Sequence, residues 1–140
     1  LGVPVSGAEQ YPQRLGPTAA ALKERIGPLP HKRCFSAGVC GDVFEQWNNE
    51  GRSRVLVCGI ETHVCVMQTA FDVAAAGFEV HVAVDAVGAR YAVDHETALR
   101  RMGFAGVILS TTETAMFEWC RTAESAEFKA ISALAKEKSP

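Results

Sequence analysis

The sequence predicts an α/β protein built as a three-layer sandwich, in which helices cover both faces of a parallel sheet. Two observations support this fold class: apolar strand-like segments alternate with segments of helical periodicity in the second half of the chain, and short loops connect them. The 140 residues are 48% hydrophobic and 21% charged, which is the composition of a globular protein, and we expect one domain over residues 1–140. No apolar run approaches the roughly 18 residues of a membrane span, so we expect no membrane partner.

The first half of the chain carries proline and glycine at short intervals, which favours brief elements joined by loops. Its signals are a β-branched run, an alanine-rich segment behind a threonine N-cap, and a later segment with helical spacing of apolar residues. The predicted elements are a strand at Leu1–Ser6, a loop at Glu9–Thr18, a helix from Thr18 to Ile26, an extended segment at Lys32–Ala37 and a helix at Val39–Asn49.

The second half of the chain has the clearer periodicity. Its first strand is a continuous apolar run, as expected where helices cover both faces of a sheet, and right-handed crossovers are expected to join the parallel strands. The predicted strands are Arg54–Gly59, Glu79–Asp85 and Ala105–Leu109. The predicted helices are His63–Ala76, His95–Met102, a helix that runs through about Arg121 with Ser110, Thr111 and Thr112 as candidate N-caps, and Ser125–Lys136.

The charge balance argues against a nucleic-acid partner. The chain has 14 Lys and Arg residues and 16 Asp and Glu residues, which gives a net charge of −2, and the basic residues form no block. The five cysteines are an odd number without Cys-x-x-Cys spacing, and no signal peptide is recognisable, so a reducing, cytoplasmic location is expected. The four histidines are scattered, and we expect neither a metal site nor a cofactor.

Cys65 has the most reactive setting that the sequence offers. It follows the turn after a predicted strand and falls in the first turn of a predicted helix, where unpaired backbone N–H groups and the helix dipole favour a thiolate. The same N–H groups can hold an oxyanion. The alternative is a buried cysteine that packs against the sheet, which is the interpretation we give to Cys58. Lys32 also has two interpretations, a cation beside a thiol or a solvated surface lysine.

A longer motif surrounds Cys65. Residues 55–76 (VLVCGIETHVCVMQTAFDVAAA) contain the pattern CGIET-x-x-C-V-x-x-T-A, and with it the chain resembles the isochorismatase-like cysteine hydrolases, which include nicotinamidases and other amidases. Upstream, EQYPQRLGPT and K-x-C-F-S resemble the isochorismatase domain-containing branch of that family. The resemblance covers essentially the whole chain. It implies the strand order 3-2-1-4-5-6, whose central first strand is missing from this sequence, so we expect a domain that is incomplete at its N-terminus.

The resemblance implies a Cys-Lys-Asp triad, with Cys65 as the nucleophile and Lys32 as its cationic partner. It also implies a cis peptide bond between Ile60 and Glu61, which directs the backbone N–H groups of Glu61 and Cys65 into an oxyanion hole. The family aspartate lies at the end of the missing first strand, and no aspartate of this sequence matches its motif. An aspartate in an unseen N-terminal segment is therefore the expected base.

Three further residues are candidates for substrate binding, namely Gln10, Tyr11 and Phe35. Nicotinamidases carry an Asp/His metal cluster at the position where this chain has the residues EQYP, starting at Glu9. We therefore expect a reaction that does not depend on a metal ion.

The function implied by the resemblance is cysteine-dependent hydrolysis of the C–N bond of a small amide or related carbonyl compound through a thioester intermediate. The alternative is a catalytically silent binding or scaffold protein that retains the fold and the thiol. The expected partners are a small-molecule substrate and, through an apolar region around Trp119, further copies of the chain in a homo-oligomer. An organellar location stays open if a targeting segment precedes Leu1.

Overall fold

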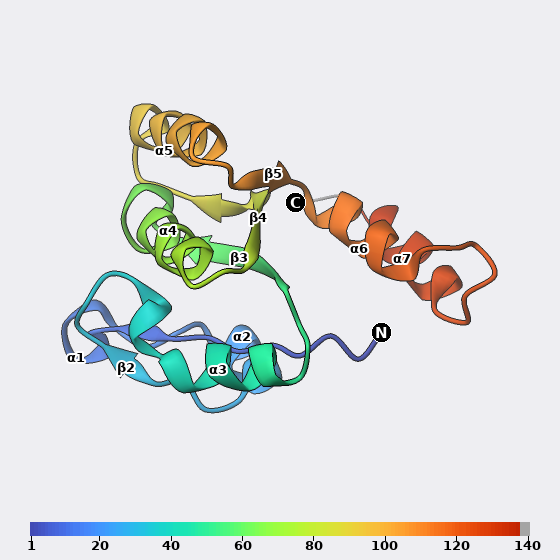
Figure 1. Ribbon diagram of the computed structural model, residues 1–140, viewed down its shortest axis with the longest axis horizontal. Coiled ribbons are helices and arrows are strands. Elements are labelled where there is room, and N and C mark those ends of the chain that lie inside the picture. The colour runs from blue at the N-terminus through green and yellow to red at the C-terminus, as the bar shows by residue number, and fades with distance from the viewer. Residues whose placement is uncertain (138–140) are drawn as a thin grey trace.

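Two parallel sheets organise the chain in a computed structural model that describes residues 1–137 (Figure 1). The larger sheet has the order β3-β4-β5, with strands β3 (Arg54–Ile60), β4 (Glu79–Gly88) and β5 (Ile108–Ser110). The smaller sheet pairs β1 (Glu9–Gln10) with β2 (His31–Lys32). Helices flank the sheets, so the α/β fold class predicted from the sequence is confirmed.

The helices lie on both sides of the larger sheet. In Figure 1, α4 and α5 lie to the left of strands β3–β5, and α6 and α7 lie to the right. One turn, η1, is a 3-10 helix, and another, η2, is a π-helical turn that leads directly into α4. The bounds in chain order are α1 Pro12–Leu15, α2 Ala20–Ile26, η1 Ala37–Val39, α3 Gly41–Asn49, η2 Thr62–Val66, α4 Met67–Ala75, α5 Ala92–Phe104, α6 Thr112–Cys120 and α7 Phe128–Ala135.

The hydrophobic core forms where α4 and α5 pack against β4. Helical spacing places Val66, Ala70 and Val73 on the same face, and each is at most 3% exposed. Alternation along β4 buries Val80 and Val82 on the opposing face. The complete cluster consists of Val66, Met67, Ala70, Val73, Phe78, Val80, Val82, Ala98, Met102 and Val107. Removal of this apolar surface from water is the main force that fixes the two helices on the sheet.

The elements predicted for the second half of the chain are confirmed, with shifts at their ends. The helix predicted from His63 begins one residue earlier, as the π-helical turn η2. The last strand starts at Ile108, three residues after its predicted start, and the last helix starts at Phe128. Of the three candidate N-caps, Thr111 caps α6, because its hydroxyl accepts a hydrogen bond from the backbone N–H of Thr114 at 3.2 Å.

Some predictions for the first half are wrong. Glu9–Thr18 is not a loop throughout, because it contains the strand β1 and the helix α1. Leu1–Ser6 is not a strand, because an extended segment becomes a strand only by pairing, and within the described chain β1 begins at Glu9 and pairs with β2. Thr18 does not cap α2: Ala19 is the N-cap residue, without a side-chain hydrogen bond. The backbone N–H of Thr18 instead donates to Oε1 of Glu9 at 2.8 Å.

Cys58 was expected in the core and is exposed. Within residues 1–137, β3 is hydrogen-bonded to β4 on one edge, and none of its residues is fully buried. The sequence pattern of a strand covered on both faces therefore overestimates how much of β3 is buried.

Candidate active site

The β1–β2 ladder determines where the side chain of Lys32 lies. Gln10 pairs with Lys32, and the preceding residues Glu9 and His31 pair with each other. Because side chains alternate between the two faces of a ladder, Gln10 and Lys32 lie on one face and Glu9 and His31 on the other. Lys32 is only 7% exposed, which contradicts the interpretation of a solvated surface lysine.

The ammonium group of Lys32 is surrounded by acceptors. Its Nζ donates to Oε1 of Gln10 at 2.6 Å, to the carbonyl oxygen of Phe35 at 2.6 Å and to that of Cys34 at 3.2 Å. A fourth contact, at 3.6 Å, leads to Sγ of Cys65. A lysine ammonium has three hydrogens and only donates. These acceptors therefore fix the position of the ammonium beside the thiol.

The side chain of Gln10 has one defined orientation. Its Nε2 donates to the carbonyl oxygen of Arg33 at 2.9 Å, so Oε1 is directed toward Lys32. The same Oε1 lies 3.8 Å from Sγ of Cys65. The structure thus brings together three predicted site residues that are separated by up to 55 positions in the sequence.

Cys65 lies in η2, at the carboxyl end of β3, and is half-buried. Its backbone is held by Thr69, whose hydroxyl donates to the Cys65 carbonyl oxygen at 2.6 Å. The exit of a parallel strand into a helix is where open α/β sheets bind ligands. The thiol is therefore at a suitable place for chemistry on a small molecule.

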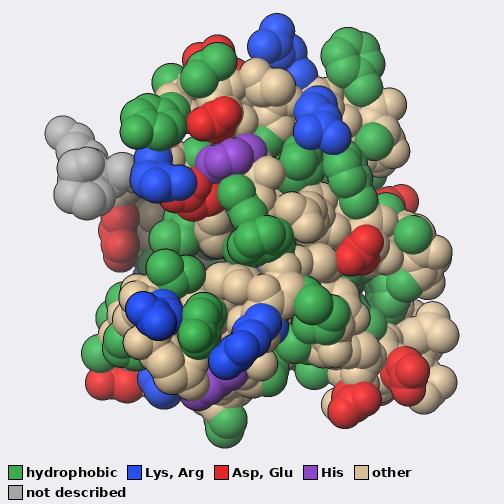
Figure 2. All heavy atoms as spheres, turned by 90° about the vertical axis from the view of Figure 1, so that its left-hand side faces the viewer, with side chains coloured by type: hydrophobic (Ala, Val, Ile, Leu, Met, Phe, Trp, Pro, Cys, Tyr) green, Lys and Arg blue, Asp and Glu red, His purple; other side chains and the backbone are tan. Residues whose placement is uncertain are grey.

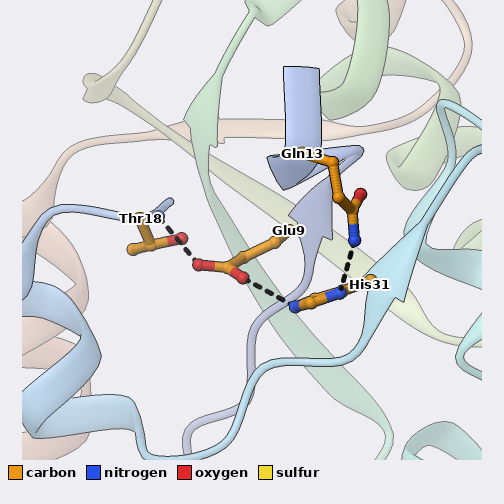
Figure 3. Close-up of polar contacts among 4 residues, drawn as sticks. All are labelled: Glu9, Gln13, Thr18 and His31. Atoms are coloured by element: carbon orange, nitrogen blue, oxygen red, sulfur yellow. Dashed lines mark hydrogen bonds and ion pairs between the residues drawn. The ribbon is translucent and has the colours of Figure 1, made fainter. Parts of the chain in front are cut away.

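On the other face of the ladder, a buried carboxylate holds β1 and β2 together (Figure 3). Glu9 is 4% exposed, and it accepts a hydrogen bond from the backbone N–H of Thr18 at 2.8 Å and lies 3.1 Å from Nε2 of His31. Nδ1 of His31 is 3.5 Å from Nε2 of Gln13. The N–H of Thr18 is the main cause that holds the pKa of Glu9 below its ordinary value.

The Ile60–Glu61 peptide bond is cis. The Glu61 side chain is directed to Arg90, with 2.7 Å between Oε1 and Nε, and its Oε2 lies 3.6 Å from Nε2 of His63. Ile60 is 77% exposed. The contribution of Ile60 and Glu61 to an oxyanion hole stays a prediction.

The predicted substrate-binding residues differ in their surroundings. The Tyr11 ring lies under the guanidinium of Arg33, 4.7 Å from it, and borders a cavity of about 380 Å³ that Lys32 also lines. Phe35 contributes its backbone carbonyl to Lys32, and its residue surface is 51% exposed. A second cavity, of about 590 Å³, is lined by α6 and by Thr111 and Arg121, away from all the predicted site residues.

Sequence reasoning missed two residues of this region, Glu9 and Thr69. Both are polar and at least 92% buried, and neither is part of the triad that the resemblance implies. The signal for Thr69 was its place four residues after Cys65, where a helical threonine hydroxyl reaches the backbone carbonyl of the preceding turn. Glu9 gave no such signal.

Between residues 1 and 137, no group of three or more His, Cys, Asp or Glu side chains is arranged to hold a metal ion. No helix in that part of the chain is long and apolar enough to cross a membrane.

The comparisons with family profiles, with known sequences and with solved structures all indicate the same family. The isochorismatase domain profile matches residues 1–114. Isochorismatase domain-containing protein 2 of Bos taurus is 42% identical over 142 residues, which cover 100% of this chain and 68% of the bovine protein. The structure of the MAR1 ribonuclease of Caenorhabditis elegans is 34% identical with a TM-score of 0.88, covering 99% of this chain and 72% of that one.

A further solved structure is similar over part of the chain. The pyrazinamidase of Pyrococcus horikoshii, in complex with zinc, is 36% identical with a TM-score of 0.52, covering 59% of this chain and 46% of that one. Together with the parallel α/β fold, these similarities define a protein of the isochorismatase-like hydrolase class. The chain belongs to the isochorismatase family.

Proposed function

We propose that this protein hydrolyses the C–N bond of a small amide or related carbonyl compound, with Cys65 as the nucleophile. The observation that carries the proposal is the distance of 3.6 Å between Nζ of the buried Lys32 and Sγ of Cys65. Unit charges at about 4 Å attract by about 4 kcal/mol at an effective dielectric constant of about 20. The ammonium therefore favours a thiolate, which is the nucleophilic form of cysteine.

The reaction proceeds in two steps. The Cys65 thiol gives up its proton to a base, the thiolate attacks the carbonyl carbon and a C–S bond forms, and the C–N bond breaks as the amine leaves with that proton. Water then adds to the thioester, the C–S bond breaks, and the acid and the thiol are released. Lys32 stabilises the thiolate before attack and after release, and Gln10 holds the ammonium in place.

The negative charge on the substrate oxygen during both steps needs hydrogen-bond donors. We assign this role to the backbone N–H groups of Glu61 and Cys65, at the start of the helical segment that follows β3. We assign Gln10, Tyr11 and Phe35 to the substrate-binding surface. The backbone N–H of Tyr11 donates to the carbonyl oxygen of Lys32, and the carbonyl oxygen of Phe35 accepts from the Lys32 ammonium.

The comparisons support amide chemistry through one relative. The Pyrococcus horikoshii protein is named a pyrazinamidase, an enzyme whose name refers to an amide. Its structure contains zinc, whereas the reaction that we propose uses Cys65 as the nucleophile and Lys32 as its cationic partner and needs no metal ion. We also propose that residues 1–140 form one domain, and the support is the hydrogen bond that joins Ala37 in the first half of the described chain to Thr69 on α4.

The test is a survey of small carboxamides for release of amine, using the wild-type protein, Cys65→Ala and Cys58→Ala. We expect turnover by the wild type and by Cys58→Ala, and none by Cys65→Ala. Intact mass of a quenched reaction is expected to show an acyl adduct on Cys65. Turnover by Cys65→Ala at the wild-type rate refutes the proposal, and a lack of turnover and adduct in all proteins favours the silent alternative.

RNA hydrolysis is a second candidate, favoured by the name of the Caenorhabditis elegans relative. The net charge of −2 weakens this candidate, since affinity for RNA depends on cationic side chains that neutralise phosphates. On the face shown in Figure 2, the Lys and Arg side chains are scattered among acidic and hydrophobic ones. The same set of variants incubated with single-stranded RNA separates the two candidates: RNA cleavage that survives Cys65→Ala points away from the amidase.

A second copy of the chain is the partner that we propose besides the substrate. Phe117 and Trp119 on α6 and Leu134 on α7 are 37%, 41% and 51% exposed, which is an unfavourable arrangement for large apolar side chains in water. We expect light scattering to give a mass above that of one chain, and Trp119→Glu to lower it. A monomeric wild type refutes this proposal.

A further inference from the structure

Thr69 forms two hydrogen bonds with one buried hydroxyl. It lies on α4 and is 8% exposed, and its Oγ1 donates to the carbonyl oxygen of Cys65 at 2.6 Å while accepting from the backbone N–H of Ala37 at 2.8 Å. A hydroxyl has one hydrogen and two lone pairs, so it can make both bonds at once. Thr69 therefore connects the backbone at the thiol to the segment that begins at Ala37.

The segment before Ala37 is the one that holds the ammonium of the site. The carbonyl oxygens of Cys34 and Phe35 both accept from Nζ of Lys32. The next residue, Ser36, is 7% exposed and accepts a hydrogen bond at its Oγ from the backbone N–H of Gly38 at 2.9 Å, which fixes the turn η1. Because Cys34 and Phe35 are only three and two residues before Ala37, a displacement of Ala37 also displaces the two carbonyl oxygens that accept from Lys32.

The turn η1 also lies very close to α4. A Cβ atom on Gly38 would be 3.0 Å from Cβ of Asp72, so a larger residue at position 38 would require η1 and α4 to move apart slightly. Close packing sets the distance between η1 and α4, and the hydrogen bond from Ala37 to Thr69 sets their alignment. The two contacts together define the position of residues 34–37, which hold the Lys32 ammonium, relative to α4 and the Cys65 thiol.

We propose that Thr69 is a positioning residue, whose hydroxyl fixes the separation between the Cys65 thiol and the Lys32 ammonium by joining the backbones that carry them. This inference rests on the proposed role of Cys65 as the nucleophile. It assigns to Thr69 no contact with the substrate: the hydroxyl acts through Cys65 and through the carbonyl oxygens of Cys34 and Phe35.

The test compares Thr69→Val, which keeps the shape and removes the hydroxyl, with Thr69→Ser, which retains the hydroxyl. Val73→Ala is the matched control, since Val73 is 1% exposed on the same helix and belongs to the core cluster instead of the hydrogen-bonded connection. The measured quantity is the rate of iodoacetamide alkylation at Cys65 as a function of pH, read by peptide mass spectrometry, with the exposed Cys34 as an internal reference.

We expect Thr69→Val to lower the Cys65 rate at neutral pH about tenfold and to move its pH profile toward that of Cys34, because the thiolate has lost its aligned cation. Thr69→Ser is expected to stay within about twofold of the wild type. Val73→Ala is expected to lower the thermal midpoint while it leaves the Cys65 rate within about twofold.

The outcomes separate the two proposals. If Cys65 of the wild type reacts no faster than Cys34, both the nucleophile role and the positioning role are overturned. If wild-type Cys65 is reactive and Thr69→Val keeps that reactivity, only the positioning role is overturned. Equal decreases of the Cys65 alkylation rate in Thr69→Val and Val73→Ala show a role in stability alone and overturn the positioning role. A decrease in Thr69→Val that is absent from Thr69→Ser supports the positioning role.

Discussion

Glu9 and His31 are partners across the β1–β2 ladder, with 3.1 Å between the carboxylate and Nε2 of the imidazole, one position before Gln10 and Lys32. The contact on one face of the ladder therefore sets the register of the pair on the other face. The buried carboxylate of Glu9, which lies outside the candidate site, thereby keeps Lys32 paired with Gln10.

Glu9 is expected to make the stability of the fold sensitive to acid. Its pKa is lowered in the folded state, chiefly by the N–H of Thr18, from an ordinary value of 4.5. The ionised carboxylate therefore stabilises the fold above that ordinary value, and the stabilisation is lost as the pH falls through the lowered folded-state pKa. Thermal unfolding from about pH 7 to about pH 3 is expected to show a smaller acid-induced decrease for Glu9→Gln than for the wild type. Glu24→Gln, on the exposed surface of α2, is the control and should follow the wild type.

Lys32→Met is expected to slow alkylation of Cys65 at neutral pH by more than tenfold. Methionine fills much of the same space without a charge, and the loss removes an attraction of a few kcal/mol, of which about 1.4 kcal/mol already corresponds to a factor of ten. Lys23→Met, on the exposed surface of α2, is the control for the change of charge. An unaltered rate in Lys32→Met contradicts the ion-pair interpretation of the 3.6 Å contact.

Asp85 is expected to stabilise the junction of β4 and α6. Its carboxylate accepts from the backbone N–H of Thr112 at 2.8 Å and from the Thr112 hydroxyl at 2.6 Å, and the hydroxyl is the main cause that lowers the Asp85 pKa. Asp85→Ala should cost about 0.5–2 kcal/mol of unfolding free energy, as for lost helix caps. In urea titrations, Asp85→Ala combined with Thr112→Val should cost less than the sum of the single changes; strict additivity argues against the contact.

Met102 is expected to be a major determinant of stability. It is fully buried in the core cluster, and truncation of such a side chain to alanine costs about 2–5 kcal/mol because it leaves a cavity. Phe104, two residues later on the same helix, is 92% exposed, and its replacement by alanine should change the unfolding free energy by less than about 0.5 kcal/mol. Chemical denaturation of the two variants compares these values directly.

The second half of the fold was predictable because its periodicity reports burial directly. The alternation of Val80 and Val82 in β4, and the spacing of Val66, Ala70 and Val73 around α4, match the faces that the structure buries. The first half was less predictable, since β1 and β2 have two residues each, too few for a period. Their pairing depends on Glu9 and on other contacts distant in sequence.

For the candidate site, the setting of Cys65 after a strand was visible in the sequence, and the resemblance added Lys32 as its partner. Burial of Lys32 was not visible, because it depends on the carbonyl oxygens of Cys34 and Phe35, and backbone oxygens leave no trace in residue identity. The exposed state of Cys58 was missed for a related reason: an apolar pattern does not state which edge of β3 finds a neighbour.

The short length of the β1–β2 ladder has a consequence for tolerated sequence changes. A slip of one residue between two strands moves every side chain to the opposite face. Here such a slip would exchange Lys32 for His31 or Arg33 beside the thiol and separate the ammonium from Gln10. Insertions between Gln10 and His31 leave the pairing residues intact, whereas a deletion within either two-residue strand is expected to shift the pairing and so the position of the ammonium relative to Cys65. Chain length at these four positions therefore matters to the site as much as the identity of its charged residue.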